Sequence, residues 1–163
     1  MAVRNISMKT SDLLSIQSQE AGKRRDTRRI DVEDIMLALV AFHPMATSRA
    51  CELLDLPFHI MLFTLLPRMG QIKELRDTET EPLPGGSGNR IMEDAMYCAD
   101  KRGASVCTVG DVFYACMRFL MPQKFARGSF EFSKDESILV WKVAELYDER
   151  SLEAEEGNGQ LLG

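Results

Sequence analysis

The chain has 163 residues, 45% of them hydrophobic and 28% charged, which is typical of a globular protein and excludes a disordered or fibrous one. Its longest hydrophobic runs are far shorter than the roughly 20 residues that cross a bilayer, so we expect no membrane span. A net charge of -5 argues against a general nucleic-acid binder, because neutralising phosphates requires a basic surface.

The first half of the chain begins with two predicted helices. The first is capped at residues 10–11 and ends at about Gly22, since glycine is common just past helix ends. Asp31 can cap the second helix, with Asp34 in its first turn. The run over residues 35–40 is hydrophobic on nearly every side, so we expect this helix at the centre of the fold.

Proline residues mark the next boundaries. Pro44 is expected to stop the central helix, and a short helix follows at about residues 47–54. Pro57 suits the first turn of a fourth helix over residues 58–66, because the missing N–H would have no partner there. Residues 70–89 are first charged and then rich in Pro and Gly, so we interpret them as a linker.

The second half repeats this organisation. A helix begins near Arg90, and Gly103 lies just past its end. Thr108 and Asp111 resemble a capping box, in which two polar residues three apart satisfy backbone N–H groups, and a further apolar helix follows them. A final helix is expected over residues 133–149.

The two halves correspond at a fixed spacing of 77 residues, without a gap. The match preserves the order of cap, apolar run, stop and final helix, which indicates an internal duplication. The equivalent pairs are Leu14 with Ile91, Arg25 with Arg102, Val32 with Val109, Asp34 with Asp111, Ala38 with Ala115, Phe42 with Phe119, Leu62 with Leu139 and Leu66 with Val143.

We therefore predict an all-α fold, an eight-helix bundle of two tandem four-helix halves. The predicted organisation is an N-terminal arm (1–9), a first four-helix repeat (10–69), a linker (70–89), a second four-helix repeat (90–149) and a disordered acidic tail (150–163). The expected core consists of Leu14, Ile35, Leu39, Phe42, Leu62, Leu66, Ile91, Ala95, Val112, Ala115, Phe119, Leu139 and Val143.

Residue patterns of known catalytic sites are absent from the sequence. With two histidines, no HExxH motif and no CxxC pair, a zinc site has little support. The Gly-rich residues 85–88 lack the following Lys and Ser or Thr of a phosphate-binding loop, and no GxSxG occurs. We expect no enzyme, metal or cofactor. The four cysteines are interpreted as buried free thiols, and the N-terminus lacks a secretory signal, which favours a cytoplasmic protein.

One basic segment departs from the acidic average, since residues 23–29 contain five cations in seven positions. Cations near a helix C-terminus complement the helix dipole. We therefore interpret this segment as a solvated helix end and loop, and not as a nucleic-acid site.

Several of these motifs together resemble a known family. The segment IDVEDIMLALV at residues 30–40, a break, ACELLDLP at residues 50–57 and a fourth helix resemble the repeat of the Clp N-terminal domain. RIMEDAMYCADKRGASVCTVGDVFYACM, residues 90–117, looks like the second repeat, and the resemblance covers about residues 8–149. It implies a pseudo-twofold bundle of eight helices, attached in that family to hexameric protein-unfolding ATPases, where it receives substrates or adaptor proteins.

The implied function is protein binding without catalysis, in substrate or adaptor recognition for a Clp unfoldase or protease, or as its accessory subunit. The partners would be Clp ATPase or protease subunits, adaptors or client polypeptides, with no membrane and no small-molecule substrate. This chain has no ATPase module. The resemblance is therefore compatible with the N-domain of a larger ATPase and with a free-standing accessory protein.

The resemblance also indicates candidate binding residues. In some family members, carboxylates at the start of the second helix of each repeat grip a phosphorylated arginine, and Glu33 matches the first of them. The second position is Gly110, which has no side chain, although Asp111 lies next to it. We expect a groove where the halves meet, with Glu33 as a polar contact and with four apolar residues, alternatively simple core residues, at its rim. These four are Phe58, Met61, Phe119 and Met121.

A tandem histone-like fold is the alternative interpretation. The segment ADKRGASVCTVGDVFYACM, residues 99–117, also resembles the loop and third helix of a histone-like unit. That fold would predict nucleic-acid binding, for which the basic surface is missing outside residues 23–29.

Overall fold

The computed structural model describes residues 5–24, 29–57, 87–120 and 134–157. Within these ranges the chain is mostly helical, in agreement with the predicted helical class. It also contains one small parallel sheet that the sequence did not predict. The elements are β1 (Asn5–Ile6), α1 (Met8–Asp12), η1 (Leu13–Gln17), α2 (Ser18–Gly22), α3 (Val32–Phe42), α4 (Pro44–Leu53), α6 (Gly88–Lys101), β2 (Val106–Cys107), α7 (Val109–Leu120), α9 (Lys134–Leu146) and α10 (Glu149–Gly157).

The first helical segment starts earlier than predicted. Ser7 is its N-cap, since its side chain accepts a hydrogen bond of 3.2 Å from the Thr10 backbone N–H. The Thr10 hydroxyl instead donates to the backbone carbonyl of Cys107 over 3.2 Å, which ties this helix to the second half of the chain. The helix continues from α1 through the π-helical turn η1 into α2. The predicted cap at residues 10–11 therefore lies inside the helix.

Gly22 is needed for close packing and not for a left-handed turn. It is the last residue of α2, and the left-handed conformation that follows the helix is taken by Lys23, with φ of 56°. A Cβ atom at Gly22 would overlap the carboxylate of Asp34. The absence of a side chain therefore lets α2 approach α3 closely.

The central position predicted for residues 32–42 is confirmed. Asp31 and Asp34 form the capping box of α3, and the Asp31 N–H donates to Asp34 Oδ2 over 2.9 Å. The apolar residues 35–40 are all buried. Pro44 does separate two helices, but α4 begins directly at Pro44, earlier than the expected residue 47, because proline is tolerated in the first turn of a helix.

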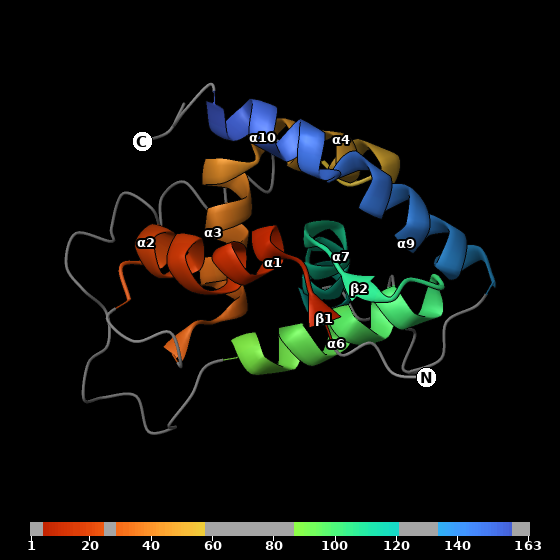
Figure 1. Cartoon of the computed structure of the whole chain (residues 1–163), viewed down its shortest axis with the longest axis horizontal. Helices are drawn as coiled ribbons and strands as arrows, with labels where there is room; N and C mark the ends of the chain where they lie inside the picture. The colour runs from red at the N-terminus through yellow and green to blue at the C-terminus, as the bar shows by residue number, and fades with distance from the viewer. Residues whose placement is uncertain (1–4, 25–28, 58–86, 121–133, 158–163) are drawn as a thin grey trace.

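The core lies where α3 and α7 meet. Figure 1 shows these two helices between α6 on one side and α9 with α10 on the other, and α9 and α10 also contact α4. Seven predicted core residues are buried, namely Ile35, Leu39, Ile91, Ala95, Val112, Ala115 and Val143. Leu14, Phe42, Phe119 and Leu139 are partly buried against this core, while Leu62 and Leu66 lie outside the described residues.

Disorder was predicted for residues 150–163, and this prediction is wrong for residues 150–157, which belong to α10. The Asp148 carboxylate accepts a hydrogen bond of 2.7 Å from the Ser151 backbone N–H, as a helix cap does. Leu152 is buried, so α10 is fixed by packing as well as by its cap. The acidic and Gly-rich composition of this segment predicted disorder, because a single buried leucine hardly changes the average composition.

Two backbone contacts connect the halves reciprocally. In the first, β1 runs parallel to β2, with Ile6 opposite Cys107, and the Ser7 N–H donates to the Cys107 carbonyl over 2.9 Å. In the second, the Gly88 N–H at the start of α6 donates to the Ile30 carbonyl over 2.7 Å. The segment that begins each half thus binds the loop before the central helix of the other half. Gly88 belongs to α6, so this helix begins two residues before the predicted start near Arg90.

In the described part of the chain, no helix is both long enough and apolar enough to cross a membrane.

Candidate functional site

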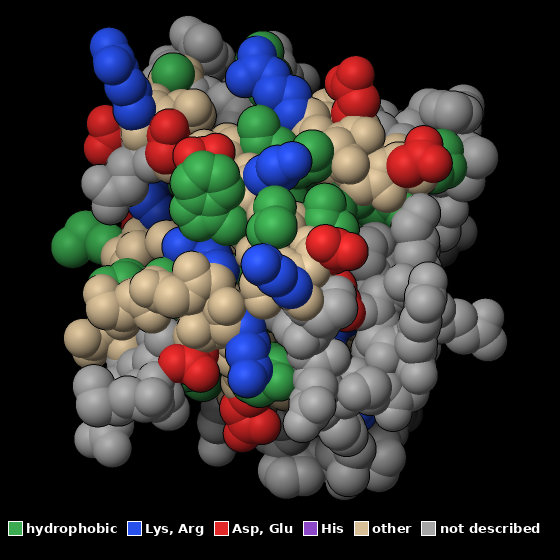
Figure 2. Space-filling model, turned by 90° about the vertical axis from the view of Figure 1, so that its right-hand side faces the viewer, with side chains coloured by type: hydrophobic (Ala, Val, Ile, Leu, Met, Phe, Trp, Pro, Cys, Tyr) green, Lys and Arg blue, Asp and Glu red, His purple; other side chains and the backbone are tan. Residues whose placement is uncertain are grey.

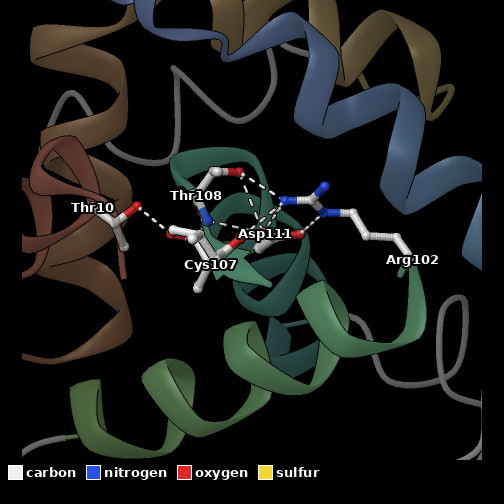
Figure 3. A network of polar contacts seen from close by, with 6 residues as sticks. Thr10, Arg102, Cys107, Thr108 and Asp111 are labelled. Carbon is white, nitrogen blue, oxygen red and sulfur yellow. Dashed lines mark hydrogen bonds and ion pairs between the residues drawn. The ribbon is translucent and has the colours of Figure 1, made fainter. Parts of the chain in front are cut away.

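The loop between α6 and α7 is held by an ion pair between Arg102 and Asp111 (Figure 3). Arg102 Nε lies 2.8 Å from Asp111 Oδ1, and Nη2 lies 2.8 Å from Oδ2, which is the two-pronged geometry that favours a strong pair. Burial alone would lower the pKa of Arg102, but the hydrogen bonds and charge of Asp111 outweigh it and raise that pKa. The guanidinium therefore stays charged.

Asp111 also forms the predicted capping contact at the start of α7. Its Oδ2 accepts hydrogen bonds from the Thr108 backbone N–H over 2.9 Å and from the Thr108 hydroxyl over 3.2 Å. Asp111 is fully buried, and these donors together with Arg102 satisfy the hydrogen-bonding capacity of its carboxylate. The same carboxylate thus fixes both the helix start and the preceding loop.

A related cluster precedes α3 in the first half. Arg24 Nε lies 3.0 Å from Asp34 Oδ2, and its Nη2 lies 3.0 Å from Asp31 Oδ2. Asp34 and Asp111 stand at the predicted spacing of 77 residues, but the arginine equivalent to Arg102 is Arg24 and not Arg25. The solvated interpretation of the basic segment is wrong for Arg24, which is 2% exposed because two carboxylates bind it.

The predicted binding residues fall into two groups. Phe58, Met61 and Met121 lie outside the described residues. Glu33 lies in the first turn of α3 and Phe119 in the last turn of α7, and both are half-buried. The guanidinium carbon of Arg90 lies 5.4 Å from the centre of the Phe119 ring. Phe119 therefore packs partly against the core and contacts Arg90.

Residue 110 is the position at which the resemblance would place a second carboxylate for phosphoarginine. Packing leaves no room for a side chain there. Gly110 is buried, and a Cβ atom there would lie 2.6 Å from the Cα atom of Ala144 on α9. A longer side chain at residue 110 would require α9 to move. Asp111 does not replace it as a free group, since its carboxylate binds Arg102. Residues 110 and 111 therefore offer no unpaired carboxylate to a partner.

A cavity of about 380 Å³ opens beside this loop. It lies between the residues at the start of α1, the loop before α7 and the junction of α9 with α10. Trp141 and Tyr147 contribute aromatic walls, and the charged lining consists of Lys9, Arg102, Glu145 and Asp148. Sequence reasoning missed this site because its members come from three separated segments, and Trp141 was assigned only as an apolar residue of the last helix.

Exposed hydrophobic side chains adjoin the cavity on α9. Trp141 is 49% exposed, and Ile138, one helical turn before it, is 44% exposed. Residues three apart share a helix face, so these two form one apolar ridge beside the cavity. Figure 2 shows the end of the molecule that lies to the right in Figure 1, where hydrophobic side chains gather centrally with charged side chains between them.

The cysteines are buried free thiols, as predicted. Burial raises the pKa of Cys51 and of Cys107 to about 12, and it also raises the pKa values of Cys98 and Cys116. Thiols in this state are poor nucleophiles. Among the described residues, no group of three or more His, Cys, Asp or Glu side chains is arranged to hold a metal ion.

Comparison with protein-family models, with curated proteins and with solved structures found no match to this chain.

Proposed function

We propose that this chain is a non-catalytic protein-binding domain of the Clp N-terminal type. In this proposal two tandem four-helix repeats form an eight-helix bundle with pseudo-twofold symmetry. The domain acts in substrate or adaptor recognition for a Clp unfoldase or protease, or as an accessory subunit of such an assembly. Its partners are Clp subunits, adaptors or client polypeptides.

The observation that carries the proposal is the repetition of one structural unit in both halves. Each central helix starts with a polar cap, and in each an aspartate three residues later binds an arginine from the preceding loop. The reciprocal contacts of Ser7 with Cys107 and of Gly88 with Ile30 add a second correspondence. Both support a duplicated architecture, which is the basis of the family resemblance.

The surface at the end of α9 supports protein binding in particular. It combines a cavity with the half-exposed Trp141 and Ile138, and aromatic residues are enriched where proteins bind one another. The rigid frame around Arg102 and Asp111 gives this surface a fixed shape, so less ordering is required when a partner binds.

Capture of partners from an extract of the native host tests this function. The immobilised chain is expected to enrich a Clp ATPase, a protease subunit or a client polypeptide, identified by mass spectrometry, over blank beads. Variants Glu33→Ala and Phe119→Ala that keep the wild-type circular dichroism spectrum are expected to enrich these partners less. Enrichment of no Clp component or client by the wild-type chain would refute the function.

Retention on DNA at low salt separates this function from the histone-like alternative. Arg24 is occupied by Asp31 and Asp34, so it contributes little to a basic surface. We expect the chain to pass a DNA column at about 50 mM salt. Retention that falls steeply with salt would instead favour nucleic-acid binding, since counterion release gives that dependence.

A further inference from the structure

We propose that the cavity beside Trp141 receives an arginine or lysine side chain from a partner polypeptide. The inference rests on the proposed protein-binding function and names the chemistry of the segment that this surface recognises. It uses the residues that line the cavity and none of those assigned to binding from the sequence.

The arrangement of the charged side chains in the lining favours a cation. Four charged side chains line the cavity, and one of them, Arg102, is matched by the buried carboxylate of Asp111. The other charged lining residues are one cation, Lys9, and two carboxylates, those of Glu145 and Asp148. Arg150 also acts on Asp148 from outside the lining, so the net charge around the cavity is close to zero. A basic side chain is favoured by position, because the carboxylates of Glu145 and Asp148 are exposed whereas Arg102 is already paired with Asp111.

The two carboxylates are accessible at the cavity. Glu145 and Asp148 are both exposed. The hydrogen bond from the Ser151 backbone N–H, together with the weaker effect of the Arg150 charge, holds the pKa of Asp148 below its ordinary value. Asp148 is therefore ionised throughout the physiological pH range.

The aromatic and apolar walls suit the rest of an arginine or lysine side chain. Trp141 is half-exposed at the cavity, and an indole ring attracts a cation placed over its face. Val106, Ala144 and Leu152 supply apolar surface, against which the methylene stem of a long basic side chain can pack. The site thus offers an apolar channel for the stem and carboxylates for the charged end.

The intrinsic fluorescence of Trp141 gives a direct test, because it is the only tryptophan in the chain. Two eight-residue peptides are titrated, with the same Gly, Ser and Leu residues around either a central arginine or a central citrulline, its neutral analogue. The arginine peptide is expected to change the fluorescence saturably and to bind at least about threefold more tightly than the citrulline peptide. Equal binding of both, or no saturable change with arginine, would overturn the proposal.

Three single substitutions test which carboxylates bind the arginine peptide. Glu145→Gln and Asp148→Asn are each expected to weaken the arginine peptide about two- to fivefold, which is the range for exposed ion pairs. Asparagine also caps helices well, so Asp148→Asn preserves the start of α10. Glu153→Gln removes an exposed carboxylate of α10 that does not line the cavity, and it should leave binding unchanged. An equal effect of all three variants would show that only the net charge matters.

The result of the peptide titration can be interpreted separately from the result of the partner capture. If the wild-type chain captures Clp components or clients but the arginine peptide fails to bind, this inference is wrong and the function stands. If capture also fails, the function is wrong. Tighter binding of a matched glutamate peptide would show that Lys9 dominates the cavity, which contradicts the inference.

Discussion

Tyr147 donates a hydrogen bond of 2.9 Å from its hydroxyl to Oγ1 of Thr47, and Thr47 donates in turn to the Leu39 carbonyl over 3.1 Å. Both side chains are buried. The contact joins the end of α9 to α4 and, through Leu39, to the central helix α3. The C-terminal segment is therefore anchored to elements a hundred residues earlier in the chain.

Replacing Tyr147 by phenylalanine removes this contact without changing the ring. Thr47 keeps its hydrogen bond to Leu39, so no donor is left without an acceptor. We expect the free energy of unfolding in urea to fall by about 0.5–1.5 kcal/mol. Thr47→Ser keeps the hydroxyl and serves as the control for the contact itself. An unchanged stability of Tyr147→Phe would show that the hydrogen bond does not anchor the segment.

The two ion-pair clusters predict parallel effects in the two halves. Asp111→Asn leaves the Arg102 guanidinium without its charge partner. Asp34→Asn removes the fully buried partner of Arg24, which keeps its ion pair with Asp31. Breaking a buried pair from one side costs about 3–5 kcal/mol, so both variants should unfold at clearly lower denaturant concentration.

A double variant provides the control for these pairs. Arg102→Met with Asp111→Leu removes both charges and should be more stable than Asp111→Asn alone, because no buried charge is left uncompensated. If the double variant is the less stable one, the cap at Thr108 and not the ion pair holds this loop.

Substitution by alanine is expected to have different effects at two glycines. Gly110→Ala places a Cβ atom 2.6 Å from Ala144 Cα, so α9 must shift, at a cost of about 1–3 kcal/mol. Because Trp141 lies on α9, its fluorescence should change too. Gly103→Ala meets no neighbour but is strained by its φ of 83°, so it should lower stability without altering that fluorescence. Unchanged fluorescence in Gly110→Ala would contradict the close contact with α9.

The raised thiol pKa values predict slow cysteine modification. With the pKa of Cys51 and Cys107 at about 12, the reactive thiolate is scarce at pH 8, and burial blocks reagents as well. Mass spectrometry after a brief iodoacetamide treatment at pH 8 should find no modified cysteine in the folded chain and four in guanidinium. Rapid labelling of the folded chain would show that the core around these thiols opens.

The features that sequence predicts well here are local ones. The capping box of Asp31 with Asp34 and the contact of Thr108 with Asp111 join residues three apart, so spacing alone reveals them. The buried run at residues 35–40 likewise follows from its uniform hydrophobicity. These elements fixed the fold class and the position of the central helix.

The features that sequence missed depend on distant residues. The pairing of β1 with β2 joins segments about 100 residues apart, and neither strand exceeds two residues, so no alternation is visible. The burial of Arg24 requires Asp31 and Asp34 to face it, which a run of basic letters cannot show. The cavity was missed for the same reason, since it exists only once α1, α7 and α9 converge.

A binding titration with purified components tests the central claim most directly. The labelled chain is titrated with the Clp ATPase of its host, with the associated protease subunit and with an unfolded client polypeptide, and anisotropy is followed. A domain of the Clp N-terminal type should form a saturable complex with at least one of the three, and unlabelled chain should compete. Absence of saturable binding to all three at about 100 µM, with the chain folded by circular dichroism, would contradict it.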